Sequence, residues 1–313
     1  MSDQKQTNCI NIAYIFKTSL GSINGSWTEG NVSTVKKITK PDGTLLPYIS
    51  GQSLKYQIRK AWKEMGLKNS LSEVKQSEKT SGVNFTAGDP EKFLDDDLMG
   101  YMIASKSETR RRTAAVRTSA AIGLFPFKGD RDLGTKSKEE TGGDASAGGN
   151  IFETEIYYNY FRVNILIELD RLGKFNPSEL AEKGEGKNLE VSLDTRRQRL
   201  NYLFEALKQI WGGGKQSRIL TDMEPKFMAI TFQNSKMPIF LESLNVSENE
   251  ELDTKAVNEV LGDYAGIIDK QILGLRTGIF KNDVSAEVTN TVSIQTAFEE
   301  AMEHIKTLDL NYV

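Results

Sequence analysis

The sequence predicts an α+β fold with the ferredoxin-like order of elements. Two segments with alternating apolar residues, 8–17 and 155–169, have the pattern of buried strands. Two segments with apolar residues three and four positions apart, 50–65 and 195–211, have the pattern of amphipathic helices. Shorter strand patterns precede the second long strand and follow the second helix. The resulting order is βαββαβ, which is that of ferredoxin-like domains, including RNA-recognition domains.

The first helix is expected to begin at Ser50, whose hydroxyl can accept a hydrogen bond from an amide of the first turn. An amide and three cations fall within about one quadrant of the helical wheel: Gln52, Lys55, Arg59 and Lys63. They point the same way from a helix N-terminus, which favours phosphate. A solvated helix face is the alternative interpretation of this stripe.

The long strand at 155–169 has two chemically different faces. Its core side is aliphatic, and its other side carries Tyr158, Tyr160, Arg162 and Asn164. An aromatic and basic sheet face can stack bases, as in sheet-based RNA-binding domains. The alternative is that inserted segments of the chain cover this second face.

The second helix is expected to begin after Asp194, to bury Trp211 and to end at Gly212. The residues that follow are Gly213, Gly214, Lys215, Gln216, Ser217 and Arg218. We call residues 212–218 the glycine loop. Glycine lets backbone amides approach a ligand closely, and the cations and neutral donors add to an anion site. A solvated helix C-cap is the alternative, but contact with a phosphate backbone is the favoured interpretation.

The glycine loop does not have the pattern of a P-loop. That motif needs Gly, four residues and then Gly-Lys-Ser/Thr, placed between a strand and a helix. Here Gln209 stands at the first glycine position, Gln216 follows Lys215, and the segment ends a helix. A nucleotide site of the P-loop kind is therefore not predicted.

The residue types of the chain limit its chemistry. Cys9 is the only cysteine, which excludes an internal disulfide and a zinc site made of cysteines. His304 is the only histidine, which removes most catalytic triads and histidine metal sites. No apolar run approaches the roughly 18 residues of a membrane span, and the polar N-terminus does not have a signal-peptide pattern. We expect a cytoplasmic protein without a cofactor, metal ion or membrane partner.

The net charge of −3 hides an asymmetry along the chain. Residues 106–128 contain six cations and one acid, and residues 240–313 contain fourteen acids and five cations. A chain of this kind can bind a polyanion at one face and stay soluble, and the acidic surface of one copy can meet the basic surface of the next. Three more cations oppose the dipole at the start of the second helix and hint at an external partner: Arg196, Arg197 and Arg199.

Two segments interrupt the predicted core. Residues 66–96 are polar with little periodicity and form a predicted insertion. Residues 128–150 contain six glycines and almost no apolar residue, so they are expected to form a mobile loop or the tip of a long hairpin. Towards the C-terminus the sequence predicts strands at 226–232 and 237–244 and helices at 253–272 and 294–308.

Three short motifs resemble a known family: LPYISGQSLK at 46–55, DLMGYM at 97–102 and GKQS at 214–217. They are similar to the repeated backbone subunit of type I CRISPR surveillance complexes (Cascade), and most closely to the DevR autoregulator family of subtype I-B. The similarity covers nearly the whole chain. It implies a non-catalytic, hand-shaped protein that polymerises head to tail along a CRISPR RNA. The partners it implies are the guide RNA, target DNA, further copies of the chain and other Cascade subunits.

The resemblance also implies a division of the chain. The palm would comprise residues 1–65 and 153–313, the fingers about 66–123 and the thumb hairpin about 124–152. Guide phosphates would be held by the glycine loop from 213 to 218 and by Ser50, Gln52, Ser53 and Lys55. Charge alone adds Arg59, Arg110, Arg111, Arg112 and Arg117 to the predicted RNA-binding residues. Three consecutive glycines depart from relatives that often have fewer, which leaves the backbone path of the loop open.

Two other functions compete with this one. Related backbone subunits of type III complexes cleave target RNA with an acidic residue and a metal, which makes a metal-dependent RNA endonuclease the alternative. The acids it would use are Asp95, Asp96, Asp97, Asp130 and Asp132. We favour the non-catalytic function, because Asp97 is expected at a strand start and the loop acids lie among lysines. A DNA-binding regulator is a third possibility, but the sequence has no recognition-helix pattern.

Overall fold

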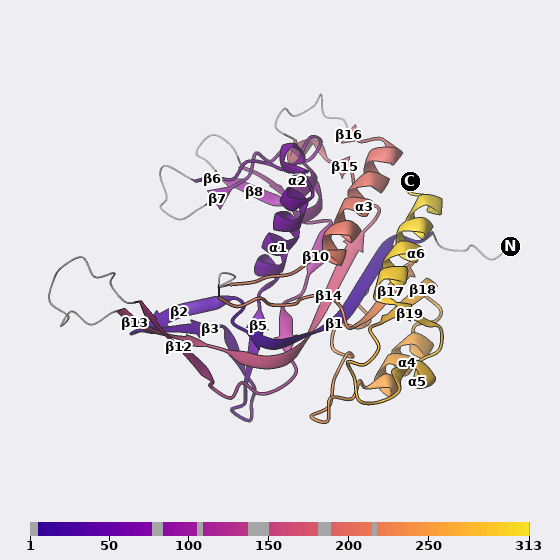
Figure 1. Ribbon diagram of the computed structural model, residues 1–313. Helices are drawn as coiled ribbons and strands as arrows, with labels where there is room; N and C mark the ends of the chain where they lie inside the picture. Colours follow the sequence, from indigo (N-terminus) through magenta and orange to yellow (C-terminus); the bar gives the residue numbers. More distant parts are fainter. Residues whose placement is uncertain are drawn as a thin grey trace.

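A large central sheet organises the computed structural model, which describes residues 6–76, 84–104, 109–136, 150–180, 189–214 and 218–312. Two long antiparallel strands form its middle (Figure 1): β1 (Cys9–Gly21) and β14 (Tyr157–Glu168). Next to β1 lies β17 (Phe227–Gln233), and next to β14 lie β10 (Val116–Thr118) and β11 (Ala121–Gly123). The order β17-β1-β14-β11 agrees with the predicted βαββαβ arrangement.

Further strands widen this sheet on both sides. Beyond β17 lie β18 (Ile268–Leu275) and β19 (Thr291–Ser293). Beyond β11 lie β5 (Leu45–Ile49) and β4 (Lys37–Thr39). Segment 268–272 was predicted to continue a helix, and this prediction is wrong: Ile272 and Leu273 are buried in the sheet against β17. Sheet pairing has overridden a helical spacing of apolar residues.

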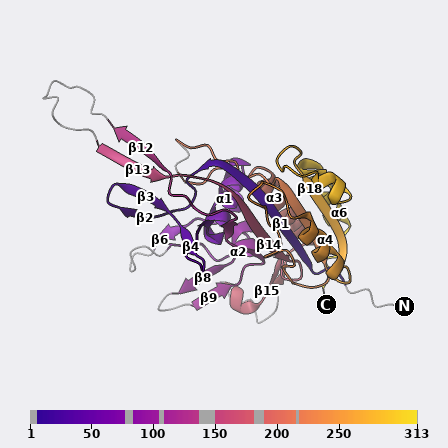
Figure 2. The ribbon, with the colours of Figure 1, turned by 90° about the horizontal axis from the view of Figure 1, so that it is seen from below.

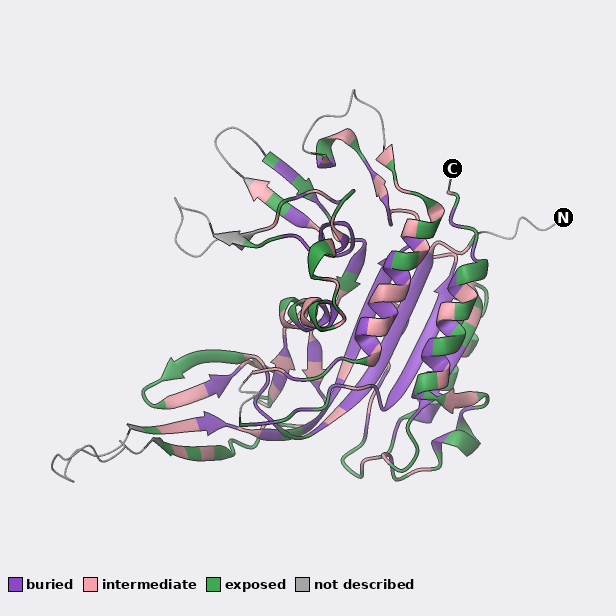
Figure 3. Cartoon of the chain, turned by 45° about the horizontal axis from the view of Figure 1, so that its top comes forward, coloured by how far each residue is buried: buried purple, intermediate pink, exposed green. Residues whose placement is uncertain are grey.

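Three helices cover one face of the sheet (Figure 3): α1 (Gly51–Glu64), α3 (Leu193–Lys208) and α6 (Ile294–Thr307). The apolar stripes of these helices pack on the Ile10, Ile12, Tyr14 and Phe16 side of β1. Ser50 caps α1 as predicted, since its Oγ accepts a hydrogen bond from the Ser53 amide at 3.3 Å. The cap of α3 is Ser192 and not Asp194, and α3 ends four residues before Gly212.

The C-terminal part of the chain covers the second face. Residues between 239 and 288, including α4 (Thr254–Asp263) and α5 (Val284–Glu287), pack on Tyr160 and the Ala13 side of β1. Tyr160 is buried, and Arg162 donates to the Glu242 carbonyl at 3.0 Å. Of the two interpretations of this face, the covered one therefore holds for these residues, although the C-terminal part covers it and not the inserted segments. Residues 237–244 form turns in place of the predicted strand.

The insertion between α1 and the central sheet carries short elements only. They are η1 (Lys68–Ser70), β6 (Lys75–Gln76), β7 (Asn84–Phe85), α2 (Leu94–Met99), β8 (Tyr101–Ala104) and β9 (Thr109–Arg112). Asp97 lies inside α2 and not at a strand start as predicted. A similar short group follows β14: β15 (Lys174–Phe175), η2 (Pro177–Glu179) and β16 (Leu189–Glu190). No helix among the described residues has the length and apolar content that crossing a bilayer requires.

A second, four-stranded sheet projects from the central one (Figure 2). It contains the hairpin of β12 (Arg131–Lys136) and β13 (Asn150–Glu155), joined to β3 (Val32–Val35) and β2 (Gly25–Glu29). The predicted hairpin is present in its described strands, and its tip, 137–149, lies outside the described residues. β1 extends beyond the strand pattern at 8–17 as far as Gly21, and β2 starts at Gly25, so only residues 22–24 connect the two strands.

A buried ion-pair network fastens the insertion to α3. Asp97 in α2 has no exposed surface and pairs with Arg112 and Arg199, each at 2.6 Å. The Gly173 amide donates to the same carboxylate at 3.1 Å. Arg112 also pairs with Glu179 at 2.9 Å. The guanidinium groups of Arg112 and Arg199 therefore share the buried carboxylate of Asp97, and the Gly173 amide adds a hydrogen bond to it.

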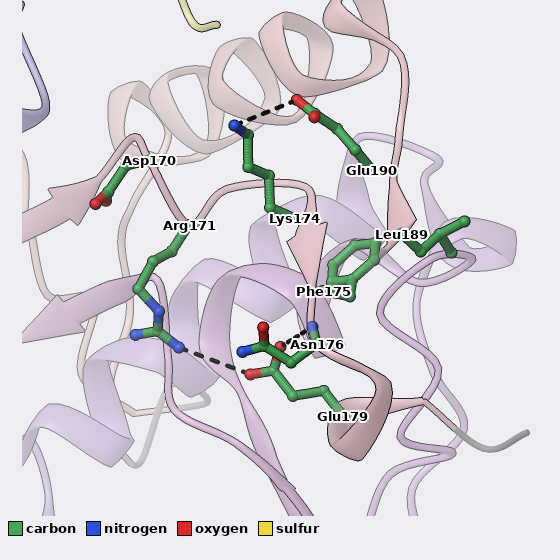
Figure 4. A pocket seen from close by; sticks show the side chains of 8 residues that line it. All are labelled: Asp170, Arg171, Lys174, Phe175, Asn176, Glu179, Leu189 and Glu190. Carbon is green, nitrogen blue, oxygen red and sulfur yellow. Dashed lines mark hydrogen bonds and ion pairs between the residues drawn. The ribbon is translucent and has the colours of Figure 1, made fainter. Parts of the chain in front are cut away.

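The arginines at the start of α3 also have partners within the chain. Arg196 pairs with Glu190 at 2.6 Å, and Arg197 donates to the Leu308 carbonyl at 3.0 Å. Arg199 pairs with Asp97, so all three arginines have partners within the chain. The prediction that they indicate an external partner is therefore wrong. Figure 4 shows the neighbouring polar pocket, where Arg171 faces Glu179 and Lys174 faces Glu190.

Replacing Asp97 tests this network against a matched neighbour. We expect Asp97→Asn to lower the free energy of unfolding by about 3–5 kcal/mol, because the buried Arg199 loses its carboxylate partner and Arg112 keeps only Glu179. Asp96 is equally buried but accepts from the Asp89 amide at 2.9 Å, and burial raises its pKa. Asp96→Asn should therefore leave stability unchanged or raise it at pH 7, as measured by urea unfolding.

The pH dependence gives a second check on Asp96. A raised pKa in the folded state means that ionisation of Asp96 costs stability above the pKa of the unfolded chain, about 3.9. The advantage of Asp96→Asn over the wild type should therefore shrink as the pH falls towards 4. Equal losses for both variants at pH 7 would contradict the distinction between the two carboxylates.

Candidate nucleic-acid interface

The N-terminus of α1 is held from two sides. The Ser50 amide donates to the Asn24 side-chain oxygen at 2.6 Å. A Cβ added at Gly51 would lie 2.7 Å from the Thr118 carbonyl oxygen, so only glycine allows β10 to approach here. The first turn contains no acidic residue. Unpaired amides and the positive end of the helix dipole make this end of α1 suitable for a phosphate.

The glycine loop packs against residues 22–24, the short segment that contains Asn24. A Cβ added at Gly213 would lie 2.7 Å from the Ile23 side chain, and one at Gly214 would lie 3.1 Å from the Ser22 carbonyl oxygen. Asn24 itself has a φ of 58°, a left-handed conformation that asparagine tolerates. The structure thus brings the two predicted phosphate-binding segments to one turn, residues 22–24.

The described part of the glycine loop begins as a narrow antiparallel turn. The Gly212 amide donates to the Thr221 carbonyl at 2.9 Å, and Trp211 bridges to Asp222. Gly212 and Gly213 both have positive φ, so this path demands glycine at two positions. Lys215, Gln216 and Ser217, which were predicted to contact phosphate, lie outside the described residues.

Arg218 connects the glycine loop to the β12–β13 hairpin. Its guanidinium pairs with Asp132 in β12 and lies 4.6 Å from the centre of the Phe152 ring in β13. Asp132 pairs with Thr154, and paired residues of antiparallel strands point to the same side. Phe152 lies two residues before Thr154 on β13, so Asp132 and Phe152 share one face of the hairpin. The loop and the hairpin therefore meet through this side chain.

The polar stripe of α1 points towards the insertion and not only into solvent. Lys55 donates to the Met99 carbonyl at 3.2 Å, and burial lowers its pKa. Arg59 pairs with Asp95 at 2.7 Å and donates to the Ser72 carbonyl. Gln52 is exposed and Ser53 half-buried at the start of the helix.

The arginines predicted from charge do not form one cluster. Strand alternation in β9 turns Arg110 and Arg112 inward and leaves Arg111 exposed. Arg110 donates to the Ala87 carbonyl at 3.4 Å and lies over the Tyr101 ring. Arg117 is exposed on β10 and pairs with Glu168. The structure therefore buries the side chains of Arg110 and Arg112 within the protein.

The acids considered for a metal-dependent cleavage are engaged within the chain. Asp95 pairs with Arg59, Asp97 with Arg112 and Arg199, and Asp132 with Arg218. In the part of the chain that the structure describes, no three acidic, histidine or cysteine side chains gather as a metal site would require. Asp130 is exposed at the base of the hairpin.

Sequence reasoning missed two residues at this interface. Asn24 was not among the predicted site residues, yet its carboxamide oxygen accepts from the amide of Ser50, the cap of α1. Trp211 was expected in the buried stripe of the second helix, but α3 ends earlier and the side chain is substantially exposed. The glycines that follow Trp211 were the one signal that the helix stops before it.

Comparison with known proteins gives a consistent picture. The family model of the CRISPR-associated negative auto-regulator DevR/Csa2 matches residues 12–251. A chain of a CRISPR RNA-guided surveillance complex in a pre-nicking state is similar in structure, with a TM-score of 0.60, 12% identity, and coverage of 95% of this chain and 100% of that chain. A chain of another CRISPR RNA-guided surveillance complex gives a TM-score of 0.59 and 16% identity over 95% of this chain and 99% of that chain. No curated protein sequence matches significantly.

The contact between Gly213 and Ile23 can be tested by adding one methyl group. We expect Gly213→Ala to lower the free energy of unfolding by about 1–3 kcal/mol more than Gly278→Ala. Both glycines have positive φ, but a Cβ at Gly278 would meet nothing within 4 Å. Thermal or urea unfolding of the two variants gives the comparison. Equal losses would show that the backbone conformation alone, and not packing on residues 22–24, requires glycine at 213.

Proposed function

Because the chain belongs to the CRISPR-associated DevR/Csa2 family, we propose that it is a non-catalytic, CRISPR RNA-binding backbone subunit of a type I-B Cascade complex. It polymerises along the guide and presents it for base pairing with target DNA. Its other partners are further copies of itself, head to tail, and the remaining Cascade subunits. We place this assembly in the cytoplasm.

The observation that carries the proposal is the convergence of two anion-binding segments on residues 22–24. The start of α1 offers backbone amides, and the glycine loop offers close backbone approach followed by Lys215 and Arg218. Contacts of this kind hold a nucleic acid by its phosphates and carry no sequence information. That is what a guide requires, since base pairing reads the target and the base edges must stay free.

The proposed contact residues are a subset of those predicted from sequence. They are Ser50, Gln52, Ser53, Lys55, Gly213, Gly214, Lys215, Gln216, Ser217 and Arg218, with Arg111 and Arg117 as peripheral cations. We leave out Arg110 and Arg112, which are buried, and Arg59, whose side chain is only 18% exposed. Arg117 and Arg218 also have carboxylate partners, but their side chains are 54% and 30% exposed. We keep Lys55, which donates to the neutral Met99 carbonyl.

We further propose that the central sheet with its helices is the palm, the insertion before β10 the fingers, and the β12–β13 hairpin the thumb. The boundary of the fingers falls before Val116 and not at 123, because β10 and β11 pair with β14 in the central sheet. Head-to-tail contact between different surfaces gives an open array and not a closed ring. The charge asymmetry of the chain suits such a contact.

Removing the two cations of the glycine loop tests the phosphate contact. We expect Lys215→Ala with Arg218→Ala to weaken guide binding roughly tenfold or more for all sequences alike. The slope of log K against log salt should fall by about 0.7 for each phosphate that the variant no longer neutralises. Lys255→Ala with Lys281→Ala removes the same charge from the acidic C-terminal part and serves as the control. A loss of affinity for one guide sequence only would contradict the proposal.

Assembly on RNA is tested by expressing the protein together with a CRISPR array. We expect a large particle with a high ratio of absorbance at the nucleic-acid and protein maxima, which shrinks after nuclease treatment. Incubation of that particle with labelled complementary RNA and Mg²⁺ should leave the RNA intact. A nucleic-acid-free monomer under all conditions would refute the assembly, and cuts at regular spacing would refute the non-catalytic role.

A further inference from the structure

An exposed aromatic and apolar patch borders the glycine loop. Tyr56 on α1 is 66% exposed, Trp211 is 42% exposed, and Leu220 is 81% exposed. The Lys60 ammonium lies 4.4 Å from the centre of the Trp211 ring. Tyr56 precedes Lys60 by one helical turn, so the two side chains are neighbours on the surface of α1. We call Tyr56, Lys60, Trp211 and Leu220 the stacking patch.

The turn that carries the glycine loop explains why this patch faces outward. Trp211 bridges to Asp222 in antiparallel fashion, and the Gly212 amide donates to the Thr221 carbonyl. Residues two apart along an extended segment share a face, so Leu220 lies on the same side as Asp222 and Trp211. Thr221, on the opposite side, is buried. The helix stops at Lys208, and both Leu207 in its last turn and Ile210 just after it are buried, whereas Trp211 is exposed.

We propose that the stacking patch binds unpaired nucleobases of the RNA strand whose phosphates the glycine loop holds, with Trp211 and Tyr56 as the stacking side chains. The inference rests on the proposed function and adds a base contact to it. Trp211 lies two residues before Gly213, so a nucleotide whose phosphate sits on the loop has its base within reach of the indole ring.

The chemistry of the patch favours a nucleobase over a protein side chain. Aromatic rings interleaved with cations along a backbone-binding groove are the means by which proteins hold single strands without reading sequence. Lys60 supports one part of the indole and leaves the rest open to solvent. Its ion pair with Glu64, at 3.5 Å, keeps the side chain extended along the helix. The contact is sequence-tolerant, because every base has a π-face.

The decisive experiment compares RNA with and without bases. Binding of a uridine oligonucleotide and of an abasic oligonucleotide of equal length is measured for the wild type, Trp211→Ala and Trp211→Phe. We expect Trp211→Ala to bind the uridine strand about tenfold more weakly and the abasic strand unchanged. Trp211→Phe, which keeps a ring, should recover most of the affinity. Thermal unfolding of each variant confirms that the fold is retained.

Tryptophan fluorescence gives a direct readout of stacking. The chain has three tryptophans. Trp62 is buried and its indole nitrogen donates to the Tyr202 carbonyl, so a ligand on the surface does not contact it. Trp27 is exposed, and Trp27→Phe removes its fluorescence. In that background the uridine strand should quench the emission of Trp211, and the abasic strand should not.

The outcomes separate the inference from the proposed function. If Trp211→Ala weakens both strands equally, or if both strands quench Trp211 equally, the patch does not stack bases and the inference is overturned while phosphate binding stands. If the uridine strand binds without any effect of Trp211→Ala, the inference is overturned as well, and a protein partner becomes the occupant of the patch. If neither strand binds the wild-type protein, the proposed function itself fails.

Discussion

The arrangement of this molecule depends on one buried carboxylate. Asp97 lies where α2, β9, the turn after β14 and α3 meet, and it accepts from Arg112, Arg199 and the Gly173 amide. A charge buried this deeply is stable only while all its partners stay in place. It therefore fixes the insertion against the helix layer, and with it the position of the Met99 carbonyl that receives Lys55 from α1.

The interface is built from segments that are distant in the sequence. Residues 22–24 leave β1, the cap of α1 follows β5, and the glycine loop follows α3. A helix end or a glycine turn is common in proteins, so neither feature alone would indicate a phosphate site. Their meeting is enforced by the Asn24 bond to Ser50 and by the fit of Gly213 on Ile23. The exposed side chains of Tyr56, Trp211 and Leu220, which we propose to contact bases, lie beside this interface.

Much of the core could be predicted from the sequence, because the patterns of β1, α1 and β14 are strong and local. Ser50 as a cap and the aliphatic side of β14 follow from periodicity alone. The errors have a common cause. Arg112, Arg196 and Arg199 were interpreted as free charge, but their partners lie on elements that no local pattern connects to them. In the same way, the second face of β14 is covered by the C-terminal part, and segment 268–272 became a strand through long-range pairing.

The parallel pairing of β13 with β3 has a mechanical consequence. The hairpin is hydrogen-bonded through β3 to β2, and β2 begins at the residue after Asn24. Arg218 joins the same hairpin to the glycine loop. The hairpin is therefore connected to residues 22–24 through β3 and β2 and to the glycine loop through Arg218. A tilt of the hairpin would displace together the two segments that we propose to bind phosphate.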